Sequence, residues 1–252
     1  MNKRPGAREP YEPTQCEHMA NVASHAVALV PSLWGVCLLA SHHHREIHHH
    51  QALFIYGLAI FSLFLASSAY HSFELLFRPN LKLVRFWLHV LDRAMIYVYM
   101  AASYMPWLVI RESGGVGLTM NYLTWMFAAC GILYQYIFHE RFKRVETMLY
   151  IVLGAGPAIP VVFAMTDRSG LCTLFYSGLA YAVGVVFFKM DGVIPFAHAI
   201  WHCHVLLGAL LQFCAVYIYL LDGQNPALLS EKAEIPDLPS LLLSPSHIHT
   251  EL

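Results

Sequence analysis

Seven long apolar stretches, separated by short polar segments, dominate the pattern of the chain. Each has at least the roughly 17 residues that a helix needs to cross the hydrocarbon core of a membrane. Lipid offers no partner for free backbone groups, and the alternating pattern of a membrane β-barrel is absent, so the stretches predict helices. The predicted spans are residues 22–39, 52–70, 86–110, 122–138, 148–165, 171–188 and 194–221.

The predicted fold is therefore an all-α integral membrane protein with seven transmembrane helices in one domain, residues 17–221. Residues 1–16 are polar and contain proline, which predicts a flexible tail before the first helix. Residues 222–252 combine proline, serine and acidic side chains, and we expect them to form a disordered tail.

Composition supports a membrane protein and excludes several other classes. The 252 residues are 58% hydrophobic and only 12% charged, against about 25% charged residues in an ordinary soluble domain. The net charge of -1 provides no basic surface, so we expect no nucleic-acid partner. The six cysteines form no CxxC pair and most lie in apolar runs, which predicts buried, reduced thiols rather than a disulfide framework.

The distribution of lysine and arginine predicts how the helices are oriented, because cytoplasmic loops carry the excess of these residues. With a cytoplasmic N-terminus, ten basic residues lie in inside segments and four in outside segments, with Arg93 set aside within a span. The C-terminus is then lumenal or extracellular. The inside residues are Lys3, Arg4, Arg8, Arg78, Lys82, Arg85, Arg141, Lys143, Arg144 and Lys189, and the outside residues are Arg45, Arg111, Arg168 and Lys232.

Ionisable residues inside membrane spans are costly and are functional candidates by default. His198 and His202 are four residues apart at the start of the last span, so they lie one turn apart on one helix face. Two imidazoles at this spacing can share one metal ion, and zinc suits neutral imidazole ligands. The alternative is a pair of packed, hydrogen-bonded histidines. A metal site would need a third ligand from elsewhere in the chain.

Alternation of the spans places two further groups at the depth of these histidines. His71 ends the second span, Asp92 lies near the start of the third, and His198 and His202 lie near the start of the seventh. All four therefore lie toward one side of the membrane, whichever side is the cytoplasm. For Asp92 an ion pair with a cation such as Arg93 is the alternative, although adjacent residues on a helix do not face each other.

Two other groups of polar residues lie outside this set. Glu17, Asn21 and His25 are spaced as one helix stripe, which predicts either hydrogen bonding between helices or support around the metal region. Residues 42–50 read HHHREIHHH in the first external loop. Such tracts can bind metal, but we interpret this one as a solvated loop outside the site.

These residues resemble the motifs of the progestin and adipoQ receptor family, which includes the adiponectin receptors and bacterial hemolysin III-like proteins. The resemblance covers about residues 15–220 and rests on three motifs: Glu17-x3-Asn21-x3-His25, Ser67-x3-His71 followed by Asp92, and His198-x3-His202. The stretches 101–108, 138–143 and 185–202 are similar to the monocyte to macrophage differentiation factor branch. The histidine-rich tract and the acidic tail depart from it.

The resemblance implies a zinc ion held by His71, His198 and His202, with a water between the metal and Asp92. It also implies a cytoplasmic N-terminus and a Golgi or endolysosomal membrane more than the plasma membrane. Some members resemble ceramidases and others are described as hormone receptors, so two functions stay open. One is a zinc-dependent lipid amide hydrolase, with Asp92 and Ser67 as catalytic residues and a ceramide-like membrane lipid as substrate. The other is a receptor or scaffold with structural zinc and a signalling protein partner. Zinc transport, suggested by the histidines of residues 42–50, is a weaker third.

Overall fold

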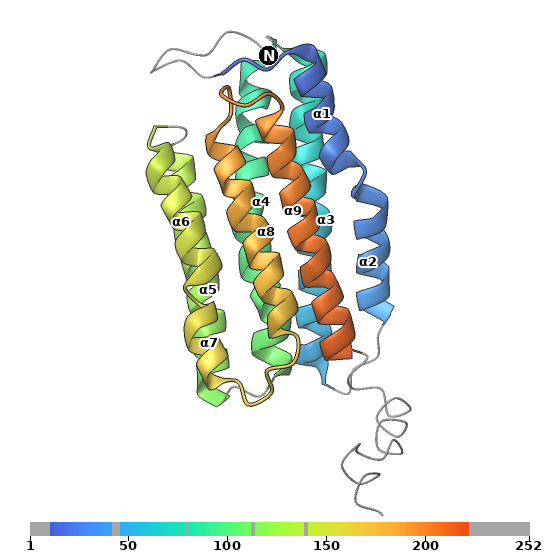
Figure 1. The fold of residues 1–252 in the computed structure, drawn as a ribbon, viewed down its shortest axis with the longest axis vertical. Helices are drawn as coiled ribbons and strands as arrows, with labels where there is room; N and C mark the ends of the chain where they lie inside the picture. Colours follow the sequence, from blue (N-terminus) through green and yellow to red (C-terminus); the bar gives the residue numbers. More distant parts are fainter. Residues whose placement is uncertain (1–10, 42–45, 79, 112–113, 139–140, 222–252) are drawn as a thin grey trace, which may run out of the picture.

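The computed structural model describes residues 11–41, 46–78, 80–111, 114–138 and 141–221, and all its regular elements are helical. Figure 1 shows the helices side by side along the long axis of the molecule. In chain order they are α1 (Gln15–Ala26), α2 (Leu29–Ser41), α3 (Ile47–Phe77), α4 (Lys82–Ile110), α5 (Gly114–Ile137), α6 (Lys143–Ala155), α7 (Ala158–Ala164), α8 (Leu171–Lys189), α9 (Ala197–Val216) and the π-helical turn η1 (Tyr217–Leu221).

Six helical stretches within these ranges are long and apolar enough to cross a membrane. They are Gln15–Ser41, Ile47–Phe77, Gly114–Ile137, Arg144–Ala164, Leu171–Lys189 and Ala197–Leu221. The 29-residue α4 is not among them, and it carries two basic residues in its first turns as well as Asp92 and Arg93. The protein is thus an all-helical, multi-pass integral membrane protein, as the apolar pattern predicts.

Prolines break two of the stretches. In an unbroken helix the C=O of Val27 would accept a hydrogen bond from the backbone N–H of residue 31, but residue 31 is proline and has no N–H. The chain turns at Val27, between α1 and α2. Pro157 and Pro160 remove two further N–H donors, and α6 accordingly ends before α7 begins. Each break allows the second half of the stretch to take its own direction.

α3 lies at the centre of the packing. In its apolar stretch 61% of the residues are buried, against 39% or less in the other five stretches. It packs against α1, α2 and α4. α9 lies against α8, where Gly184 allows close approach because a Cβ atom there would come within 2.7 Å of Trp201 and His204. The two helices that carry the candidate histidines are therefore held by close packing on several sides.

The beginning of α1, the end of α3 and the beginning of α9 lie at one end of the molecule, where the chain also enters (Figure 1). The end of η1 lies at the opposite end (Figure 1). There Arg111, just after α4, pairs with Asp167 and donates to the Ser169 hydroxyl at 2.7 Å and to the Tyr219 carbonyl at 3.1 Å. This contact ties three segments together at the end away from the candidate histidines.

The cysteines and the histidine-rich tract differ from what the sequence predicts. The cysteines are free, but five of the six are exposed on the outer surface of the helices and Cys214 is half-buried, so the expectation that they are buried is wrong. A lipid-facing helix surface is apolar, so an apolar run alone does not distinguish the core from this surface. Residues 47–50 of the histidine-rich tract belong to α3 rather than to a loop, and residues 42–45 lie outside the described residues.

The predicted tails lie largely beyond the part of the chain that the structure describes. Residues 1–10 and all of 222–252 fall there. Of the predicted N-terminal tail, residues 11–16 are described, and α1 already begins at Gln15. The Thr14 hydroxyl and the Glu17 side chain cap this helix reciprocally, because each accepts a hydrogen bond from the other's backbone N–H.

Candidate metal centre

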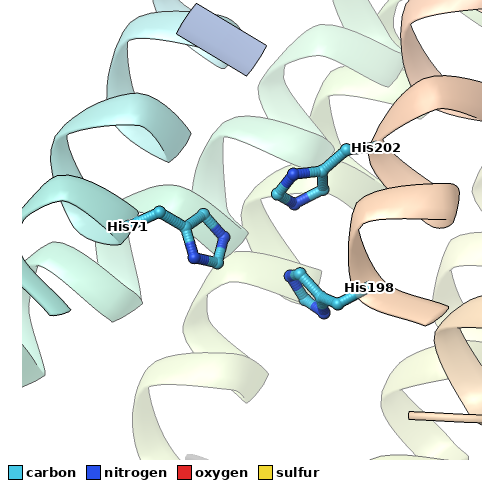
Figure 2. Close-up of side chains that lie close together, drawn as sticks. All are labelled: His71, His198 and His202. Carbon is cyan, nitrogen blue, oxygen red and sulfur yellow. The ribbon is translucent and has the colours of Figure 1, made fainter. Parts of the chain in front are cut away.

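Three histidines from two helices converge near one end of the bundle. Figure 2 shows His71 on α3 facing His198 and His202 on α9, with the three rings turned toward one another. Each residue offers one nitrogen, and these three atoms lie within 4.8 Å of one another. The His71 and His202 rings have centroids 4.8 Å apart, and those of His198 and His202 are 4.6 Å apart. The structure therefore brings together all three predicted ligands.

The hydrogen bonds of His202 decide which of its nitrogens is available. Nδ1 lies 3.3 Å from the Asn21 carbonyl and 2.9 Å from the Ser24 hydroxyl. A carbonyl oxygen only accepts, so Nδ1 carries the proton and Nε2 is left with a free lone pair. Such a hydrogen bond on the far nitrogen fixes the tautomer and orientation of a metal-binding histidine. With this tautomer, Nε2 is the nitrogen of His202 that a metal ion could use.

His71 and His198 complete the donor set. His71 is 4% exposed, and its Nε2 is buried with no hydrogen-bond partner among the described residues. A buried polar atom without a partner is unfavourable unless a ligand or metal satisfies it. His198 places Nδ1 3.5 Å from the Asp191 carboxylate, which leaves its Nε2 for the centre. A cation at the three-histidine cluster would satisfy this nitrogen of His71, and Nε2 of His25 on α1 is buried without a hydrogen-bond partner as well.

The donor set fits zinc better than a hard cation. Neutral imidazole suits zinc, whereas calcium and magnesium prefer oxygen ligands. With Zn–N distances of about 2.0–2.1 Å, a tetrahedral ion separates its ligand nitrogens by roughly 3.3 Å. The nitrogens spread over 4.8 Å would have to approach by roughly an ångström or more. Side-chain rotation of His198, the most exposed of the three, can supply part of this change.

Asp92 and Ser67 lie beside the histidines. Ser67 is one turn before His71 on α3 and is 2% exposed. The Asp92 side chain on α4 lies beside Ser67 and within electrostatic reach of His198. Arg93 donates to Glu146 on α6 at 2.7 Å and also lies within electrostatic reach of Asp92. The carboxylate of Asp92 thus faces the histidine cluster.

The stripe on α1 forms hydrogen bonds to α9 and lies against the histidine cluster. Glu17 accepts a hydrogen bond from the backbone N–H of Phe196 at 3.3 Å, which links α1 to the start of α9. Phe196 has a positive φ of 58° and caps α9 two residues before His198. Asn21 lies against His202 through its carbonyl, and His25 stacks on the same ring. α1 therefore covers the histidine cluster from one side.

Sequence reasoning did not identify two residues that contact the ligands. Ser24 contacts His202 and lies next to His25, so a search of both edges of the α1 stripe could have found it. Asp191 contacts His198 from the turn that connects α8 and α9. It lies seven residues before its partner, in an irregular segment that helix periodicity does not describe.

Comparison with known proteins gives consistent similarities over this whole region. A profile of the family described as "Haemolysin-III related" matches residues 14–213. The Homo sapiens protein named monocyte to macrophage differentiation factor is 40% identical over 223 residues, which cover 87% of this chain and 91% of that relative. Hemolysin-3 of Bacillus cereus is 31% identical over 209 residues, covering 81% of this chain and 92% of its own. The matched region contains every residue of the histidine cluster.

Proposed function

The chain belongs to the haemolysin-III-related family of membrane proteins, and we propose that it is a zinc-dependent hydrolase of membrane lipid amides. In this proposal His71, His198 and His202 hold one zinc ion, Asp92 acts at the bond that is cleaved, and Ser67 orients Asp92. The observation that carries the proposal is the buried, unpartnered Nε2 of His71 beside two further imidazoles and a carboxylate.

Three imidazole ligands leave a fourth position of a tetrahedral ion open, which is the pattern of catalytic rather than structural zinc sites. When bound, zinc polarises a carbonyl and makes a water molecule acidic enough to attack at neutral pH. Asp92 would take up the proton released by the attacking water and pass it to the leaving amine. Ser67, which lies beside Asp92, would keep its carboxylate oriented.

The position of the cluster supports a lipid as the substrate. His71 lies near the end of α3 and His198 near the start of α9, so the centre lies toward one end of the membrane helices. The amide of a ceramide-like lipid occupies the boundary between headgroups and hydrocarbon. Such a bond can reach the centre while the chains stay in an apolar environment.

A receptor or scaffold function is supported by a different observation. The three histidines come from α3 and α9, so a bound ion would also cross-link these helices. Such an ion could act structurally while the output of the protein is contact with a signalling partner. The names of the similar proteins, a differentiation factor and hemolysins, describe no hydrolase.

Measuring lipid amide turnover by the purified full chain distinguishes the hydrolase from the receptor or scaffold. We expect the zinc-loaded protein to hydrolyse ceramide or a related lipid amide, to lose turnover when zinc is chelated, and to regain it when zinc is restored. Glycerophospholipid esters of similar chain length control for amide specificity. A protein that is folded and zinc-replete but inactive on the whole amide panel would contradict the hydrolase and favour the receptor or scaffold.

We further propose seven membrane spans, with α4 as the additional one, a cytoplasmic N-terminus and a lumenal C-terminus in Golgi or endolysosomal membranes. The excess of basic residues in the segments on the N-terminal side supports this orientation. Epitope tags at the two ends should differ in protease protection in sealed vesicles, with the C-terminal tag protected, and should co-fractionate with those organelles. Tags on the same side would exclude seven spans, because an odd number of crossings puts the ends on opposite sides.

A further inference from the structure

His25 is a fourth buried histidine at the candidate centre, outside the set of three. It lies on α1 with 3% of its surface exposed. Its Nδ1 is 2.8 Å from the Ser67 hydroxyl, and its ring stacks on that of His202 with centroids 3.8 Å apart and planes 16° apart. The Phe64 ring meets the same imidazole edge-on, with ring centroids 5.2 Å apart. One side chain therefore touches both a metal-ligand candidate and the serine beside Asp92.

The donors and acceptors along this contact have one consistent direction. If Asp92 is ionised it can only accept, and the neighbouring Ser67 hydroxyl would then donate its single proton to it. The Ser67 oxygen must then accept from His25, which places the proton of His25 on Nδ1. In this arrangement His25 fixes the rotation of the serine hydroxyl, which in turn fixes the direction of the carboxylate.

The stacking contact acts on the ring of His202 rather than on Ser67 and Asp92. His202 is already held at Nδ1 by α1, but a hydrogen bond at one ring atom leaves rotation about that bond free. A parallel ring 3.8 Å away restricts this rotation and keeps Nε2 in the direction of the cluster. Phe64 supports the His25 ring from α3, so the stack cannot easily move aside.

We propose that His25 is a positioning residue with two separable actions: its Nδ1 orients Ser67 and Asp92, and its ring holds the plane of His202. The first action rests on the proposed hydrolase function, and the second only on metal binding. His25 is not one of the three residues whose nitrogens cluster.

Three substitutions separate the two actions in the full-length, purified protein. His25→Asn keeps a donor near the position of Nδ1 and removes the ring. His25→Phe keeps a flat ring and removes the donor, and His25→Ala removes both. His204→Phe is the matched control, because His204 lies on α9 and stacks on Phe187 outside the cluster. Size-exclusion profiles and thermal unfolding show whether each variant is folded.

Opposite patterns are expected for the first two variants. His25→Phe should keep zinc affinity and lose turnover by about 10–100-fold, the effect typical of residues that support a metal site. His25→Asn should lose zinc affinity by about 10-fold and recover most of its turnover at saturating zinc. His25→Ala should show both losses and the control neither. A purely structural role would lower both properties in parallel in the Asn and Phe variants, which would overturn the proposal.

Two further readouts make the test independent of general damage. If His25 acts on turnover through Ser67, then His25→Phe combined with Ser67→Ala should be no worse than Ser67→Ala alone, and additive losses would overturn this action. The visible spectrum of the cobalt-substituted protein reports ligand geometry without any turnover. It should be unchanged in His25→Phe and altered in His25→Asn, and the reverse would overturn the stacking action. A wild type inactive on lipid amides refutes the hydrolase and the orienting action, while the cobalt spectrum still tests the stack.

Discussion

Asp92→Asn is expected to keep its zinc and lose amide turnover by about 100- to 10,000-fold, the usual contribution of a general acid–base residue. Asparagine has the size of aspartate but cannot take up a proton at neutral pH. Because Asp92 faces His198 and lies beside Ser67 rather than belonging to the three-nitrogen cluster, its removal should spare the ion. The measurement is zinc stoichiometry and lipid amide turnover on the same preparation, at saturating zinc.

Asp167→Asn is the matched control. It makes the same chemical change at the opposite end of the bundle, where Asp167 pairs with Arg111. We expect this variant to keep both zinc and turnover. Loss of zinc from Asp92→Asn at saturating metal would make Asp92 a ligand, and wild-type turnover in a zinc-replete Asp92→Asn would remove it from the mechanism.

Much of the candidate centre can be predicted from the position of each residue within its membrane span. In a bundle of membrane helices, direction alternates along the chain, so the position of a residue within its span sets its depth. This reasoning brought His71, Asp92, His198 and His202 to one depth, and the structure places the three histidines together with Asp92 beside them. Periodicity likewise placed His198 and His202 on one face of α9.

The sequence does not predict how each helix is rotated toward its neighbours, or which backbone groups a side chain contacts. Helix periodicity predicts which residues share a face but not the neighbour that the face meets, so the α1 stripe kept two interpretations until its packing was known. His202 is held by the Asn21 backbone carbonyl. Because every residue has a backbone carbonyl, the pattern of side chains cannot predict this contact. Asp191 contacts His198 from an irregular turn, where no period applies.

The error on the cysteines has a related physical cause. In a soluble protein, an apolar run that contains cysteine is usually buried. In a membrane protein the lipid-facing surface is equally apolar, and here five of the six thiols are exposed. Hydropathy therefore predicted the helices but not which of their faces form the core.

The second large effect is expected from the ligands themselves. His202→Ala should lower the zinc content from about one ion per chain toward zero, because two imidazoles alone leave half of a tetrahedral site unfilled. His202 is chosen because it is 2% exposed and its Nδ1 contacts with Asn21 and Ser24 orient Nε2 toward the cluster. His71→Ala and His198→Ala should have the same effect.

His204→Ala is the control for a histidine on the same helix, since His204 contacts Phe187 and the Ile200 carbonyl instead of the cluster. The histidines of residues 42–50 must first be replaced in every protein compared, because that tract can bind metal by itself and would mask a loss at the centre. His204→Ala should then retain the zinc of the parent protein.

Metal analysis of the purified, tract-replaced full chain tests the zinc centre most directly. The three-histidine centre predicts about one zinc ion per chain in the parent protein and in His204→Ala, and close to none in His71→Ala, His198→Ala and His202→Ala. Equal zinc content in the parent protein and all three cluster variants would contradict it.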